Sequence, residues 1–184
     1  MSTKNIAVIV GSLRRESFSR KVAHNLIALA PDSLRFSIIE IGDLPLYNQD
    51  IETDTPPAAW QRFRDEVRPA HGLLFVTPEY NRSVPGALKN AIDVGSRPYG
   101  KSVWNGKPGA IVSCSPGAIG GFGANHHLRQ PMVFLNVPML PREAYLGGID
   151  KLLGTDDKFV PETAEFMSKY MHTFAAWVDK IAGS

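Results

Sequence analysis

IAVIVGS, residues 6–12, consists of five consecutive apolar residues followed by a Gly-Ser pair. An apolar run rich in β-branched residues, with no polar alternation, predicts a strand that is buried on both faces, as in the centre of a parallel sheet. Apolar residues then recur at Val22, Leu26 and Leu29, the spacing of one helix face, before Pro31 ends the pattern. This first part of the chain therefore predicts a buried strand, a short loop and a covering helix.

Apolar runs and helical stripes continue to alternate along the rest of the chain. Further strands are expected over Leu34–Ile41, Leu73–Val76, Ala110–Cys114 and Val137–Leu140. Helices are expected over Trp60–Val67, after Pro85, over Ala124–Leu135, where Pro131 should kink or shorten the helix, and over Ala164–Ile181. Such an alternation builds a parallel sheet covered by helices on both faces. The prediction is an α/β fold, a flavodoxin-like three-layer sandwich whose five-stranded parallel sheet has the order 2-1-3-4-5.

The composition is that of an ordinary globular protein. Of 184 residues, 43% are hydrophobic and 21% are charged, and the formal net charge is +2. This length predicts a single domain over residues 1–184, and the balanced charge predicts neither a nucleic-acid nor a membrane partner. The N-terminal apolar run is too short for a secretory signal, and a lone cysteine excludes an intrachain disulfide. We therefore expect a protein of the reducing cytoplasm.

A doubly wound parallel sheet predicts the place of its ligand site before any motif is considered. In such sheets ligands bind beyond the carboxyl ends of the strands, where the strand order reverses. The loops after the first, third and fourth strands should therefore form the site, and these are residues 11–19, 77–82 and 113–121.

The first of these loops is rich in hydrogen-bond donors. Ser12, Ser17 and Ser19 carry hydroxyls, and Arg14 and Arg15 carry guanidinium groups. Together with the unpaired N–H groups and partial positive charge of a helix start, these donors suit a phosphate monoester. The alternative is that a serine caps the helix and the arginines are solvated. The loop has neither the Gly-Lys-Ser/Thr of a P-loop nor the repeated glycines of a dinucleotide fingerprint.

The second loop, TPEYNRSVPG at residues 77–86, is stiffened by two prolines. Its backbone N–H groups and its tyrosine are suited to holding a heteroaromatic ring beside the phosphate, and the alternative is a plain surface turn. The third loop adds small hydroxyls on both sides of Cys114, which we expect to be an inert core residue. Gly120 stands where a Cys-x5-Arg phosphatase needs its arginine, which excludes that class.

Metal and serine-hydrolase chemistry have no motif in this sequence. The five histidines have no cysteine or carboxylate partner at a metal-ligand spacing, so no metal site is expected. There is no Gly-x-Ser-x-Gly elbow. His126 and His127 lie near the third loop and are candidates for a substrate contact, although histidines on a helix surface are more often simply solvated.

Two separated motifs resemble those of the NADPH-dependent FMN reductase family, whose members include soluble quinone, chromate and azo-dye reductases. The first is Gly11-Ser12-Leu13-Arg14 with Ser17-Phe18-Ser19. The second runs from Thr77-Pro78-Glu79-Tyr80-Asn81 through Ser83-Val84-Pro85-Gly86 to Leu88-Lys89-Asn90-Ala91-Ile92-Asp93. The resemblance covers most of residues 5–148, and both motifs begin in loops that the sheet geometry selects.

The resemblance implies one non-covalently bound FMN and assigns residues to it. The groups that would hold its phosphate are Ser12, Arg14, Ser17 and Ser19, with Phe18 in the same loop. The residues that would line its isoalloxazine ring, largely through backbone groups, are Pro78, Glu79, Tyr80, Asn81 and Arg82, with Ser115 and Gly117 on the other side. Family members commonly have Asn in place of Ser19, so one phosphate contact differs in this chain.

The activity that the resemblance implies is ping-pong hydride transfer from NAD(P)H, the co-substrate, through FMN to quinone, azo or similar small acceptors. No side chain is then required as an acid or base, so none is assigned as catalytic. The family also implies a homodimer or homotetramer with the flavin near the subunit boundary. Two alternatives stay open: a flavodoxin-type electron carrier, which a pI near 8.7 disfavours, and a flavin-free binding domain, which Arg14 and the neighbouring serines disfavour.

Overall fold

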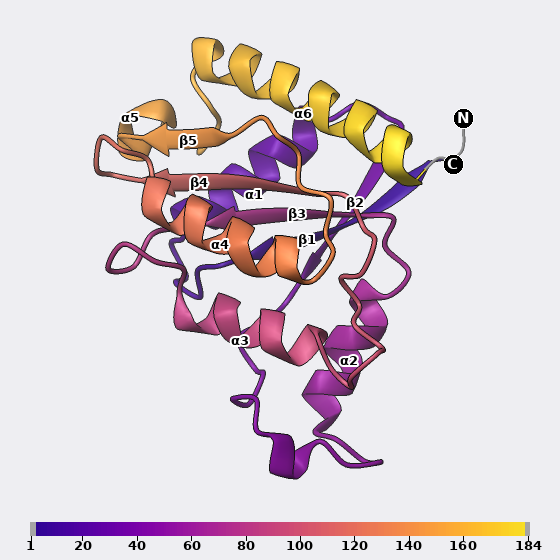
Figure 1. The fold of residues 1–184 in the computed structure, drawn as a ribbon. Helices are drawn as coiled ribbons and strands as arrows, with labels where there is room; N and C mark the ends of the chain where they lie inside the picture. The colour runs from indigo at the N-terminus through magenta and orange to yellow at the C-terminus, as the bar shows by residue number, and fades with distance from the viewer. Residues whose placement is uncertain (1–2, 183–184) are drawn as a thin grey trace.

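The computed structural model describes residues 3–182, which form a five-stranded sheet with helices on both faces (Figure 1). The strands are β1 (Lys4–Val10), β2 (Leu34–Ile39), β3 (Gly72–Thr77), β4 (Gly109–Ser115) and β5 (Ala144–Gly147). The helices are α1 (Phe18–Ala28), the 3-10 helix η1 (Gln49–Ile51), α2 (Ala58–Val67), α3 (Gly86–Gly95), α4 (Phe122–Phe134), α5 (Ile149–Leu152) and α6 (Pro161–Ala182). Neighbouring strands pair in the order β2-β1-β3-β4-β5, and every pair is parallel. The predicted flavodoxin-like sheet and its strand order are confirmed.

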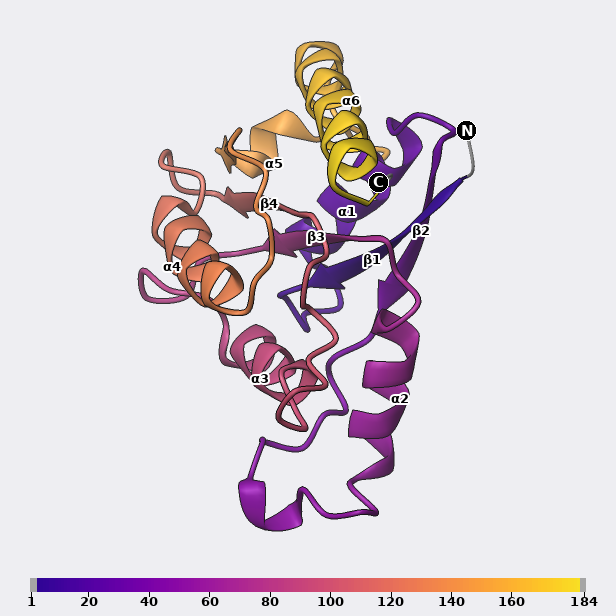
Figure 2. The same ribbon diagram turned by 45° about the vertical axis from the view of Figure 1, so that its right-hand side comes forward.

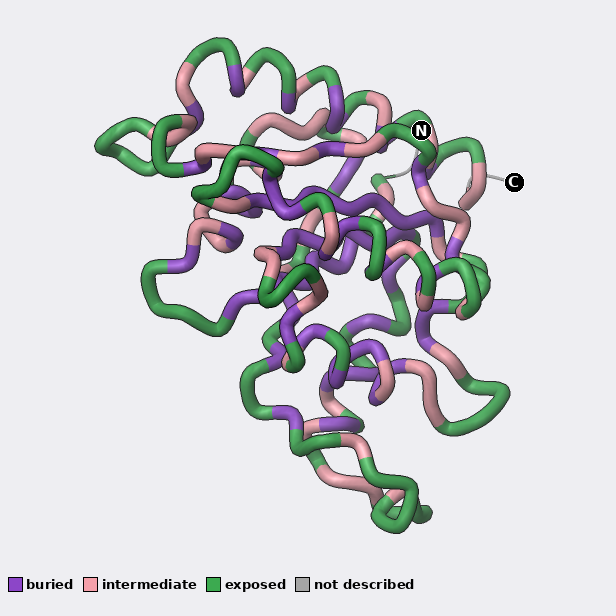
Figure 3. The backbone as a smooth tube through the Cα atoms, turned by 60° about the vertical axis from the view of Figure 1, so that its left-hand side comes forward, coloured by how far each residue is buried: buried purple, intermediate pink, exposed green. Residues whose placement is uncertain are grey.

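The apolar run of β1 is buried because each side of the strand faces a different core. Ile6, Val8 and Val10 belong to a cluster that α1 and α6 cover. Ala7 and Ile9 belong to a second cluster, which α2, α3 and α4 cover. The two helical layers lie on opposite faces of the sheet (Figure 2), and the central strands appear as long buried stretches of the tube in Figure 3. Burial on both faces explains why the run has no polar alternation.

The fifth strand is not where the sequence predicts it. Residues 137–140 form no strand; they pass beside Gly109 at the start of β4 and share two backbone hydrogen bonds with it, of 2.7 and 3.1 Å. The segment carries buried apolar side chains, which produced the strand-like pattern. Pro138 and Pro141 remove donors that a strand ladder needs. The actual β5 is a four-residue edge strand with two buried residues, too short to give a clear signal.

The structure modifies one helix prediction and confirms another. α4 continues through Pro131 to Phe134, so of the two expected effects, a kink or a shortening, the shortening does not occur. Pro131 lies in the last turn, where its carbonyl accepts the N–H of Leu135 at 2.9 Å. α6 buries Met167, Met171 and further residues at steps of three and four, as predicted. Within residues 3–182 no helix has the length and apolarity needed to cross a membrane.

A long segment between β2 and α2 extends away from the sheet, at the bottom of Figure 1, and an ion pair fastens it. Glu52, just after η1, meets the Arg64 guanidinium with oxygen–nitrogen distances of 2.9 and 2.5 Å. Arg64 also donates its Nε–H to the carbonyl of Val94 in α3 at 2.9 Å. This side chain is 1% exposed, so one arginine joins the segment, α2 and α3 in the interior.

Candidate functional site

The carboxyl ends of β1, β3 and β4 lie side by side, because Val10 pairs with Val76 and Thr77 with Ser113. The loops that follow them enclose a hollow of about 130 Å³, lined by Ser12, Arg14, Ser17, Phe18, Ser19, Pro78, Glu79, Tyr80, Cys114, Ser115 and Pro116. A second hollow of about 310 Å³ shares Arg14 and Tyr80 with the first and is otherwise lined by Gly11, Leu13, Pro85, Gly86 and Ala87. The three loops selected from the sequence therefore meet at one place.

The first loop reaches the second because residue 11 has no side chain. A Cβ on Gly11 would lie 2.8 Å from Oγ1 of Thr77 and 3.3 Å from Cδ of Pro78. Such contacts are too close for any other residue without a shift of the second loop. Gly11 thus sets the spacing between the two walls of the hollow.

Ser17 begins α1 as its N-cap. Its Oγ accepts the N–H of Arg20 at 3.2 Å, which is the capping geometry. The hydroxyl can still donate its own hydrogen, so capping leaves one donor for a ligand. The N–H groups of Phe18 and Ser19 belong to the first turn, where a helix offers them no acceptor of its own. The capping alternative is correct for Ser17, and it is compatible with anion binding.

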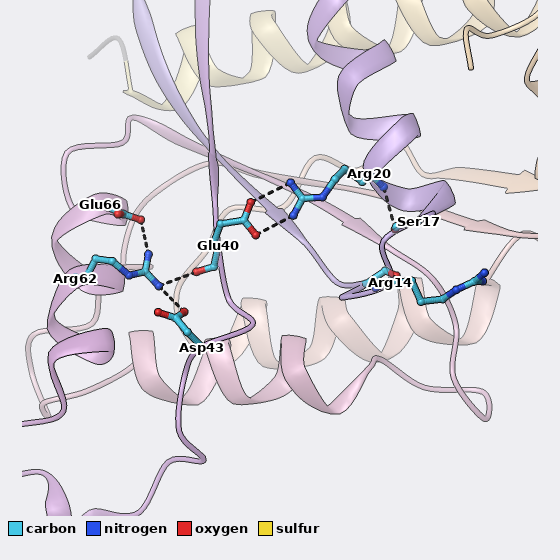
Figure 4. A network of polar contacts seen from close by, with 8 residues as sticks. Arg14, Ser17, Arg20, Glu40, Asp43, Arg62 and Glu66 are labelled. Carbon is cyan, nitrogen blue, oxygen red and sulfur yellow. Dashed lines mark hydrogen bonds and ion pairs between the residues drawn. The ribbon is translucent and has the colours of Figure 1, made fainter. Parts of the chain in front are cut away.

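Three arginines lie in or next to the first loop, and of these only Arg20 has an ion-pair partner among residues 3–182. Arg20 holds Glu40 through two hydrogen bonds of 2.9 and 2.8 Å, as Figure 4 shows. Arg14, labelled in the same view, extends away from that network. Within residues 3–182 neither Arg14 nor Arg15 forms a side-chain ion pair, and both are exposed. Arg14 lines both hollows, so its charge is available to an anionic ligand there.

Ser19 has a protein partner that the sequence did not predict. Its Oγ lies 3.3 Å from Sγ of Cys114, and each residue is 1% exposed. Both residues line the first hollow from its inner side. Burial raises the pKa of the Cys114 thiol to about 11, although the contact with Ser19 lowers it somewhat. The thiol is protonated at neutral pH, in agreement with an inert cysteine.

The burial of Cys114 predicts a pH effect on stability. The folded protein binds the thiol proton more tightly than the unfolded chain, so the free energy of unfolding is expected to fall as pH rises from about 9 to about 11. Urea unfolding at several pH values measures this slope. Cys114→Ala is the matched control and should show a shallower decline, because it lacks the thiol. Some decline remains, because Tyr145 and Tyr170, whose pKa values are also raised, are present in both proteins. An identical slope would contradict the prediction.

The second loop folds back on itself in a tight turn. Tyr80 and Ser83 exchange two backbone hydrogen bonds of 3.0 Å, and Asn81 and Arg82 between them have φ values of 51° and 63°. This is the left-handed pair of a two-residue hairpin turn. Tyr80 lies against the hollows and is 46% exposed, whereas Asn81 and Arg82 contribute to neither lining. Asn81 and Arg82 thus lie at the tip of the turn, next to the lining residues Glu79 and Tyr80.

Ser115 lines the first hollow, and Gly117 does not. The Ser115 Oγ accepts the N–H of Gly117 at 3.1 Å, which orders the start of the third loop. The lining residues that the sequence did not assign are Leu13, Pro85, Gly86, Ala87, Cys114 and Pro116, together with Gly11. Gly11, Leu13, Cys114 and Pro116 adjoin predicted residues in the same loops, and that adjacency was the signal available. Pro85, Gly86 and Ala87 follow the second loop at the start of α3, in the stretch that the second motif covers.

The two adjacent histidines have protein partners. Nδ1 of His127 lies 3.1 Å from Oγ of Ser83, and Nε2 of His126 lies 3.1 Å from the hydroxyl of Tyr145. Neither histidine lines the two hollows. Among residues 3–182, no group of three or more His, Cys, Asp or Glu side chains is placed to hold a metal ion.

The donor set fits FMN. The hollow is lined by Ser12, Arg14 and Ser17 and by the start of α1, which together offer the hydroxyl, guanidinium and N–H donors that a phosphate monoester requires. Pro78 and Tyr80 line the same hollow and offer a stiff loop and an aromatic ring against which a flat heteroaromatic ring can pack. The second hollow widens the site on the side of Tyr80.

Both the sequence and the fold are similar to those of known proteins. Residues 4–150 match the family described as NADPH-dependent FMN reductase. A quinone reductase of Pseudomonas putida is 61% identical over 175 residues, which cover 95% of this chain and 94% of that protein. A 2-hydroxy-1,4-benzoquinone reductase of Burkholderia sp is 47% identical, with 94% and 95% covered. The solved structure of FerB, a flavoenzyme NAD(P)H:(acceptor) oxidoreductase from Paracoccus denitrificans, superposes with a TM-score of 0.91 at 38% identity, covering 97% of this chain and 99% of that one.

Proposed function

Since this chain belongs to the NADPH-dependent FMN reductase family and is an NAD(P)H-dependent oxidoreductase with FMN as its cofactor, we propose that it reduces quinones and similar small acceptors, azo compounds among them. The observation that carries the proposal is the meeting of three loops around one hollow that holds an unpaired guanidinium and helix-start donors. Relatives at 61% and 47% identity are named as quinone reductases, which supports this acceptor class.

We assign the phosphate of FMN to Ser12, Arg14, Ser17 and the N–H groups that open α1. Ser19 is assigned a lesser role through its own N–H, because its hydroxyl is engaged with Cys114. The flavin ring is assigned to the backbone of residues 78–82 and to Ser115 and Gly117. FMN, when bound, supplies the hydride-transfer chemistry, and the protein binds it, orients it and shapes its access. We therefore assign no side chain as an acid or base.

The absorption spectrum of the purified protein tests the cofactor, and anaerobic addition of NADH or NADPH tests the reaction. We expect a yellow protein whose flavin bleaches rapidly with a reduced nicotinamide and recovers its colour when a quinone is added. A flavodoxin-type carrier would bind FMN yet bleach slowly. Protein that stays colourless after incubation with FMN would refute the proposal. Titration with a quinone, an azo dye and chromate ranks the acceptors.

We further propose that residues 1–184 act as one domain in the cytoplasm and assemble as a homodimer or homotetramer. Both apolar clusters share the strands of one sheet, which supports a single folding unit. An unpaired, buried Cys114 suits a reducing compartment.

For assembly, the supporting feature is a hollow of about 580 Å³ lined by Ser83, Val84, Lys89, His127, Gln130, Pro131 and Phe134. Phe134, one of these lining residues, is 86% exposed, and the neighbouring Val133 is exposed as well.

Replacing Phe134 with Asp is expected to shift the protein to a smaller assembly, because a charge placed in an apolar contact is costly to bury. Sedimentation velocity of both proteins measures the change. Phe166→Asp is the matched control, since Phe166 is an exposed phenylalanine on α6, and we expect it to leave the assembly unchanged. A wild-type protein that sediments as a monomer would contradict the assembly proposal and leave the redox proposal standing.

A further inference from the structure

We propose that Glu79 is a positioning residue: its carboxylate caps α4 from the loop after β3 and thereby fixes the backbone of residues 78–83 beside the cofactor hollow. The inference rests on the proposed function for its consequence, FMN binding. The cap itself is independent of that function. The family resemblance assigned Glu79 to the ring through its backbone, and the side chain has a different task.

The first turn of α4 has no cap of its own. Gly121 stands at the N-cap with a φ of 78° and no side chain, and no acidic residue occupies the first turn. An N-cap side chain normally accepts the N–H of the second or third helical residue. Here the N–H of Ala124, the third residue, donates to Oε2 of Glu79 at 3.1 Å, from a position 45 residues earlier in the chain. Glu79 thus does for α4 what a local Ser or Asp does for other helices.

The Glu79 carboxylate is enclosed and doubly engaged. Its side chain is 10% exposed, and Oε1 accepts a hydrogen bond from Nη1 of Arg82 at 3.1 Å. A negative charge at a helix N-terminus is favourable, because the N–H groups there carry partial positive charge. With one oxygen on the N–H of Ala124 and the other on Arg82, the carboxylate links the turn to the helix.

The close approach of loop and helix requires a glycine on the helix. A Cβ on Gly123 would lie 2.8 Å from the carbonyl oxygen of Arg82 and 2.9 Å from Oε2 of Glu79. No side chain fits there unless the loop moves away. Gly123 thus provides the space in which Glu79 reaches the N–H of Ala124.

The contact also holds a turn that is costly in itself. Asn81 and Arg82 both have left-handed backbone, which Asn tolerates but which is unfavourable for a residue such as Arg. The Glu79 contact imposes it from one side, and the contact between Ser83 and His127 of α4 imposes it from the other. The ring-facing N–H groups of this loop are therefore held in place by α4 before FMN arrives, and such preorganisation favours binding.

Two measurements on Glu79→Ala test the cap and its consequence separately. Hydrogen–deuterium exchange of the ligand-free protein reports the Ala124 amide, and quenching of FMN fluorescence reports the FMN dissociation constant. We expect the Ala124 amide to exchange about ten-fold faster and the dissociation constant to rise about ten-fold, as for the loss of one charge-assisted hydrogen bond. Glu79→Gln should restore part of both, because an amide oxygen accepts the same N–H without the charge.

Two further variants make the result specific. Gly123→Ala keeps the Glu79 side chain but pushes the loop away, so it should weaken FMN binding as Glu79→Ala does. Glu143→Ala removes a carboxylate that pairs with Arg129 of α4, with 3.3 Å between Oε1 and Nε, and that lies outside both hollows. This control is expected to leave the dissociation constant unchanged although it perturbs the same helix.

Each pattern of results decides the proposal. Faster exchange at Ala124 with unchanged FMN affinity would overturn the positioning role, because the cap would then not govern the loop. Weaker affinity with unchanged exchange would overturn it as well, because Glu79 would then act by direct contact. A wild-type protein that binds no FMN would refute the proposed function, and the exchange rates would still test the cap.

Discussion

Arg14→Ala is expected to raise the FMN dissociation constant about 10- to 100-fold with little change in the stability of the ligand-free protein. Arg14 is exposed, lines both hollows and has no side-chain ion pair among residues 3–182, so its removal breaks no contact that holds the fold. The loss is one charge-assisted hydrogen bond to phosphate, worth about 1.5–3 kcal/mol. Fluorescence titration with FMN and thermal unfolding without it measure the two quantities.

Arg15→Ala is the matched control for this prediction. Arg15 is the neighbouring exposed arginine, and it lines neither hollow. It should change FMN affinity only through the general positive potential, an effect that 0.15 M salt screens substantially. Equal effects of the two substitutions would place the phosphate elsewhere in the loop. An unchanged affinity in Arg14→Ala would remove this residue from the site altogether.

Glu52→Ala is expected to destabilise the protein by about 3–5 kcal/mol, because it leaves the guanidinium of Arg64 buried without a counter-charge. Arg64 is 1% exposed and is held by Glu52 through two hydrogen bonds, so solvent cannot compensate for the loss. The bond from Arg64 to Val94 would remain but carries no negative charge. Urea unfolding of both proteins measures the difference in the free energy of unfolding.

A surface ion pair on the same helix supplies the control. Glu66 pairs with Arg62 at 2.7 Å, and both side chains are partly exposed. Glu66→Ala should cost less than about 1 kcal/mol, because such pairs are solvated and screened. Replacing Glu52 and Arg64 together by apolar residues should cost less than Glu52→Ala does, because no unpaired charge is then buried. A small effect of Glu52→Ala would show that Arg64 reaches solvent when its partner is removed.

The sheet and its covering helices were predictable because their signals are local and strong. The run at residues 6–12 indicates burial on both faces, and α6 repeats its apolar spacing from Ala164 to Ile181, which is nearly five turns of helix. The position of the site followed from the same information, since parallel strands bring their carboxyl ends to one edge. The family resemblance then added the cofactor and its residues.

What could not be predicted depends on contacts between distant residues. The Ser19 hydroxyl meets a thiol 95 positions away, and the carboxylate of Glu79 meets an N–H 45 positions away. Neither the spacing nor the composition of residues in either loop indicates such partners. The fifth strand was misplaced for a related reason: a buried apolar segment interrupted by prolines resembles a strand until its hydrogen bonds are known.

The division of β1 between two cores makes this strand intolerant of any change in length. Within β1, the adjacent residues Val8 and Ile9 face opposite sides of the sheet. Inserting or deleting one residue would turn every following side chain to the other face, so each would meet a core packed for a different side chain. It would also displace Gly11 from Thr77. Natural variation in chain length is therefore expected in the long segment between β2 and α2. The strand that precedes the phosphate loop should keep a constant number of residues.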